Sequence, residues 1–146
     1  MSRASRLEPI ADFAGVKEAD AARRLAAAAQ AMQEKEATLE RLRGYLAEYR
    51  RRAAQDRVST AAGQWQNSRD FLAKLSDAVA FHERELDKAI EAYRLEAERW
   101  RESHRRAQAL DKVVERSQRE ARLEAEQRRQ AELDELAIQR KLFRPR

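Results

Sequence analysis

The chain lacks cysteine altogether and has only three glycines and two prolines among its 146 residues. The absence of cysteine excludes disulfides, and it leaves the redox compartment undefined. Between Gly63 and Pro145 there is neither glycine nor proline. Because these two residue types are the strongest interruptions of local structure, the segment from Gln64 to Arg144 predicts one continuous helix.

Long hydrophobic runs are also missing. No stretch approaches the roughly 20 apolar residues of a membrane span, and the opening MSRASRLEPI lacks the apolar core of a secretory signal. We therefore expect a cytoplasmic protein with no integral membrane segment. The chain is 39% charged with a mean hydropathy of −0.92, and alanine supplies much of its apolar content. Such a composition favours a narrow seam between long helices over a globular core.

The charges do not separate by sign. Lys and Arg total 31 and Asp and Glu total 26, which gives a net charge of +5, but the two signs alternate along the chain. This alternation argues against a nucleic-acid-binding tail. There is no phosphate loop, nucleophile elbow or metal-ligand spacing, and His82 and His104 are too far apart on one helix to share a ligand. We expect no catalytic, cofactor or metal site, so the chain is not predicted to be an enzyme.

Two segments carry the three-four apolar spacing of a seam between long helices. They predict a first helix over about 10–56 and a second over about 65–141, joined by a turn over about 57–64. The first seam set is Leu25, Ala28, Met32, Leu39, Leu42, Leu46, Tyr49 and Ala53. The second is Leu72, Leu75, Val79, His82, Leu86, Ala89, Tyr93, Ala97, Trp100 and Ala107. The predicted fold is all-α: a single elongated hairpin over 1–146, a two-helix antiparallel coiled coil whose second helix is the longer.

The two arms of this hairpin are unequal. At 1.5 Å per residue the predicted helices measure roughly 70 Å and 115 Å. Folding about residue 60 places Ile10 opposite Leu110, so the chain after about Val114 has no internal partner. Pairs such as Glu115–Arg119 add only a few tenths of a kcal/mol each. We expect a monomer whose C-terminal overhang frays unless something binds it.

Near the turn, both helices hold more apolar residues than one seam requires. A second stripe runs beside the seam on each helix. Its members are Leu42, Tyr45 and Tyr49 on the first helix and Phe71, Leu75, Ala78 and His82 on the second. One interpretation is a wide seam with extra packing at the tip of the hairpin. The other is an exposed aromatic patch that docks a partner.

The segment WQNSRDFLAKLSDAVAFHERELDKA, which begins at Trp65, resembles the flagellar export protein family called FliJ. The segments YLAEYR, WRESHRRAQAL and EQRRQAELDELAIQR agree with it, as do the chain length and the single central turn. The resemblance covers essentially the whole chain. One departure is Thr38, where the family pattern leads us to expect a longer polar residue.

The resemblance implies a component of the flagellar type III export apparatus, located in the cytoplasm and peripherally at the membrane of the flagellar base. Its implied partners are the hexameric export ATPase FliI, the linker of the export-gate protein FlhA, and export chaperones. It assigns gate binding to the second stripe, which favours the exposed patch. The alternatives are the equivalent stalk of a virulence-type secretion system and a generic coiled-coil adaptor that binds nucleic acid or a membrane.

Overall fold

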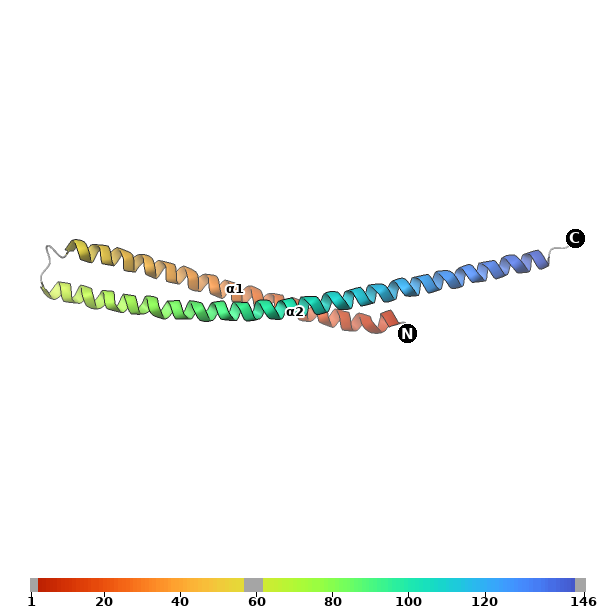
Figure 1. Ribbon diagram of the computed structural model, residues 1–146, viewed down its shortest axis with the longest axis horizontal. Coiled ribbons are helices and arrows are strands. Elements are labelled where there is room, and N and C mark those ends of the chain that lie inside the picture. Colours follow the sequence, from red (N-terminus) through yellow and green to blue (C-terminus); the bar gives the residue numbers. More distant parts are fainter. Residues whose placement is uncertain (1–2, 57–61, 144–146) are drawn as a thin grey trace. The chain divides into compact units, whose positions relative to one another are not determined.

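The computed structural model describes residues 3–56 and 62–143, which form two α-helices. Helix α1 spans Arg3–Asp56 and helix α2 spans Ala62–Leu142, so the second helix is the longer, as the sequence predicts (Figure 1). Most of the turn expected over 57–64 lies outside the described residues, and its last three residues belong to α2. The fold is all-α, and the helices pair as an antiparallel hairpin.

Helix α1 begins well before residue 10, where the sequence pattern places its start, and Pro9 lies inside it. The helix extends before Pro9 because residues ahead of the proline continue the seam against α2. Ala4 is buried, and it continues the seven- and three-residue spacing set by Ala11 and Ala14. Proline has no N–H to donate to the helix. Packing of the first turns against α2 offsets the missing bond.

By its internal contacts the chain divides into two compact units, each made from part of both helices. The turn unit is Ala21–Trp100. The terminal unit combines Met1–Asp20 with Arg101–Arg146.

In the turn unit a leucine-rich core joins the helices. Leu39 is 1% exposed, and it clusters with Leu46 and Val79. The partly buried residues packed against them are Leu42, Leu72, Leu75 and Leu86. Arg43 Nη2 also donates to Glu83 Oε1 across the pair at 3.1 Å. The helices run antiparallel here, since Tyr49, later on α1, contacts Phe71, earlier on α2.

The terminal unit has a seam of small residues instead. Its buried positions are Ala4, Ala11, Ala14, Ala107 and Ser117. Polar pairs reinforce it: His104 Nδ1 donates to Glu18 Oε1 at 2.5 Å, and Gln118 Nε2 donates to Glu8 Oε1 at 2.9 Å. Because alanine buries little apolar area, this seam contributes less hydrophobic stabilisation per turn than the leucine seam.

The unpaired part of α2 starts later than the sequence predicts. Ser117 is buried and Ala121 is half-buried, so the paired region extends past Val114. The earlier start of α1 accounts for this, because it supplies a partner for these extra turns. From Arg122 to Phe143 every described residue is exposed. We call 122–143 the overhang; Figure 1 shows it in blue, continuing past the first residues of α1.

Candidate docking surface near the turn

The structure separates the predicted patch residues into three kinds. Leu42 and Leu75 pack against the leucine core, so they belong to the seam. Ala78 and His82 are half-buried. The remaining three are the aromatic residues Tyr45, Tyr49 and Phe71, which are 53%, 40% and 47% exposed. Both interpretations of the stripe therefore describe part of it: its leucines widen the seam, and its aromatic rings lie on the surface.

Two of these rings meet across the helix pair. The centroids of Tyr49 on α1 and Phe71 on α2 are 4.9 Å apart, with an interplanar angle of 64°. An edge-to-face contact of this kind fixes ring orientation and is worth about 0.5–1.5 kcal/mol beyond area burial. Each ring nevertheless keeps a large exposed fraction. The two rings are therefore partly exposed and held in a fixed relative orientation.

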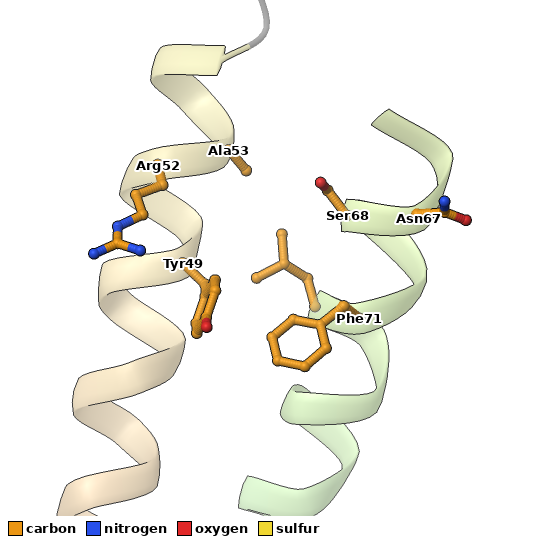
Figure 2. Close-up of a pocket in the computed structure, with 7 residues that line it drawn as sticks. Tyr49, Arg52, Ala53, Asn67, Ser68 and Phe71 are labelled. Atoms are coloured by element: carbon orange, nitrogen blue, oxygen red, sulfur yellow. The ribbon is translucent and has the colours of Figure 1, made fainter. Parts of the chain in front are cut away.

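A hollow of about 440 Å³ lies next to this pair. Its lining residues are Tyr49, Arg52 and Ala53 from α1, and Asn67, Ser68, Phe71 and Leu72 from α2. In Figure 2 the rings of Tyr49 and Phe71 converge between the helices, while Arg52 and Asn67 stand at opposite edges with their polar groups directed outward. The hollow thus has an apolar floor and a polar rim.

Arg52 is placed by its own helix. Its Nη2 donates to Glu48 Oε1 at 2.8 Å, one helical turn away. Its guanidinium carbon lies 5.9 Å from the centroid of the Tyr49 ring, within the range of a cation–π contact. A guanidinium carries five N–H donors in a fixed fork. The contact with Glu48 engages one of its two terminal nitrogens, Nη2.

His82 lies further from the turn and has an incomplete hydrogen-bond set. Its Nδ1 is buried and finds no partner among the residues that the structure describes. The ring of Phe81, itself 51% exposed, meets His82 edge-on with centroids 5.3 Å apart. Phe81 is therefore a further exposed aromatic side chain on α2.

Thr38, the departure from the family pattern, turns its hydroxyl inward. Thr38 Oγ1 donates to the carbonyl oxygen of Glu34 at 3.0 Å and accepts from Arg41 Nη2 at 3.3 Å. Arg41, about one turn later on α1, thus places a long polar side chain against Thr38.

Sequence reasoning missed Arg52, Asn67, Ser68 and Phe81. Three of them are polar residues outside any apolar stripe, and only the facing of two helices brings them to one hollow. Phe81 precedes His82 directly in sequence and falls outside the three-four spacing of the seam. That position was the only indication in the sequence that its ring is exposed. Sequence reasoning also missed the Glu18–His104 pair, because its register depends on the helix partner.

Over residues 3–56 and 62–143, no group of His, Cys, Asp and Glu is arranged to hold a metal ion. Within the same residues neither helix has a stretch long and apolar enough to cross a bilayer.

The described residues define a two-helix antiparallel coiled coil with exposed aromatic side chains near the turn. The chain belongs to the flagellar FliJ protein family, whose model matches residues 2–145. That membership makes it a component of the flagellar protein export apparatus. No curated protein matches its sequence.

Proposed function

We propose that this chain is the stalk that couples the FliI export ATPase ring to the FlhA export gate. In this proposal it acts as a monomer, peripherally associated with the membrane at the flagellar base, and helps recycle export chaperones. The observation that carries the gate-binding part is the exposed Tyr49–Phe71 pair in the turn unit.

The aromatic side chains are suited to anchoring a partner. Tyrosine and phenylalanine bring large contact areas at low entropic cost, and a few such anchors dominate many interfaces. Tyr45, Tyr49 and Phe71 contact the FlhA linker directly in this scheme. Leu42 and Leu75 hold the backbone beneath them, since they already pack on the core. Ala78 and His82 border the contact.

A binding measurement tests the gate contact. The ligand is a purified cytoplasmic fragment of FlhA that includes its linker. Phe71→Ala removes a half-exposed anchor, and we expect it to weaken binding by about 2 kcal/mol or more with little change in helicity. Leu95→Ala is the matched control, because Leu95 is 49% exposed on the same helix and lies 24 residues, about 36 Å, beyond Phe71. Unchanged affinity of Phe71→Ala would contradict the gate-binding role.

The overhang is the part proposed to contact the ATPase. It is a lone helix whose described residues are all exposed, with five Arg and Lys balanced by five Asp and Glu. A single helix is narrow enough, at about 10–12 Å in diameter, to enter the central opening of a ring. Its contacts would be polar and salt-sensitive.

Removal of residues 122–146 tests this second contact. Because the paired region ends at about Ala121, the shortened chain keeps both seams. We expect it to bind the FlhA fragment normally but to lose most stimulation of FliI ATP hydrolysis, measured in a steady-state phosphate-release assay. Full stimulation by the shortened chain would remove the reason to place the ATPase contact on the overhang.

A further inference from the structure

The hollow beside the aromatic pair has a polar rim that the proposed function does not use. Arg52, Asn67 and Ser68 line it together with Tyr49 and Phe71 (Figure 2). These polar residues come from both helices, so the rim exists only in the folded hairpin. Basic residues outnumber acidic residues in the segments around it.

The surroundings of the hollow are basic. Residues 48–53 and 67–74 contain five Arg and Lys but only two Asp and Glu, a net charge of +3. The chain as a whole reaches only +5 over 146 residues. Glu48 is one of the two acidic residues, and it is already paired with Arg52. A basic rim around an apolar floor complements a partner that is apolar at one position and acidic beside it.

We propose that the hollow is a specificity pocket that takes one large apolar side chain of an acidic partner segment, while Arg52 binds a neighbouring carboxylate. This inference rests on the proposed gate contact and names the chemistry that the contact selects. The Tyr49 and Phe71 rings and Leu72 form the apolar floor. The volume of about 440 Å³ is ample for a leucine or phenylalanine side chain.

Arg52 is better placed than the neighbouring arginines to bind a carboxylate of the partner. Its contacts with Glu48 and Tyr49 hold the guanidinium beside the hollow before binding. A planar fork held in this way loses little freedom when it pairs with a carboxylate. Asn67, at the opposite edge, carries an amide that both donates and accepts, which suits an exposed peptide group of the partner. Arg51 carries the same charge but does not line the hollow.

The test compares charge variants in binding to the same FlhA fragment. Arg52→Gln should weaken binding roughly five- to tenfold and flatten its salt dependence. Arg51→Gln, the matched control, should bind like wild type. Arg52→Glu should bind worse still, and changing one acidic residue of the linker to lysine should restore its affinity. Equal losses for Arg51→Gln and Arg52→Gln would overturn the inference, since they would indicate a diffuse charge effect.

A second pair of variants tests the hollow itself. Ser68→Leu fills it from the rim and should reduce binding at least tenfold, whereas Gln66→Leu places the same side chain at a position of α2 that does not line the hollow. Both positions are exposed, so helicity should be preserved in each. If Phe71→Ala abolishes binding while Arg52→Gln and Ser68→Leu bind normally, the pocket is wrong and the gate contact stands. If Phe71→Ala also binds normally, the gate contact itself fails.

Discussion

Leu39 is the residue on which the turn unit depends most. At 1% exposure it is the most buried large side chain described, and it forms the core cluster with Leu46 and Val79. Two helices offer no third layer to cover a defect. Loss of this side chain therefore leaves a gap that only its immediate neighbours can close.

We expect Leu39→Ala to lower the free energy of unfolding by about 2–3 kcal/mol, the lower part of the range for buried leucines. Urea denaturation followed by circular dichroism measures the change. Leu95→Ala, at a half-exposed position, should change stability by about 0.5 kcal/mol or less. Similar values for the two variants would mean that the leucine cluster is not the stabilising core.

Helix α2 changes character along its length. From Leu72 to Ala121 it carries a seam that α1 covers, and from Arg122 onward every described residue is exposed. Within the overhang, support comes from local features such as the Gln130–Asp134 hydrogen bond at 3.4 Å. Local pairs add only about 0.2–0.5 kcal/mol each. The backbone hydrogen bonds of the overhang therefore open far more readily than those of the part of α2 that α1 covers.

Hydrogen–deuterium exchange should divide α2 at about Ala121. Amides of the leucine seam should exchange slowest, because their opening requires loss of the buried core. Amides of 122–143 should exchange within seconds in the free protein and become protected when FliI is added. Uniform slow exchange along the whole helix would contradict the contrast between covered and uncovered turns.

Sequence periodicity predicted the helices and the seam, and it failed at particular residues for physical reasons. The seam leucines were found because burial imposes a spacing of three and four. The early start of α1 was missed because proline suits the first turn of a helix, so Pro9 marked a start near residue 10, and three buried alanines gave too weak a counter-signal. Leu42 and Leu75 were placed in both the seam and the second stripe, because spacing alone does not distinguish the edge of a seam from an exposed stripe. Arg52 and Ser68 meet only across the pair, so no single-helix pattern contains them.

At the scale of the whole molecule, the defining feature is a chain that pairs with itself. In the terminal unit, the Glu8–Gln118 and Glu18–His104 contacts join residues far apart in sequence. The same contacts between two chains would give an exchanged dimer. The distinction matters, because the proposed stalk acts as a monomer.

Spin labels at Lys17 and Arg106, both exposed in the terminal unit, distinguish these arrangements. Paired helices lie about 8–10 Å apart, so the labels should give a short, narrow distance distribution. Dilution of labelled chains with excess unlabelled chains should leave it unchanged. Labels at Arg106 and Arg140 should lie about 50 Å apart along α2 and give a reference distance within one helix. Loss of the short distance on dilution would indicate an exchanged dimer.

Antiparallel pairing also restricts how such a chain changes length. One inserted residue turns the rest of a helix by about 100°, so it moves every following seam residue off its partner. Seven residues restore the facing side to within about 20°, but only if the opposite helix gains seven at the matching level. The covered part of this protein therefore grows or shrinks in matched heptads. The overhang has no opposite helix and lengthens one residue at a time, so reach at that end is adjustable while the leucine and alanine seams stay in register.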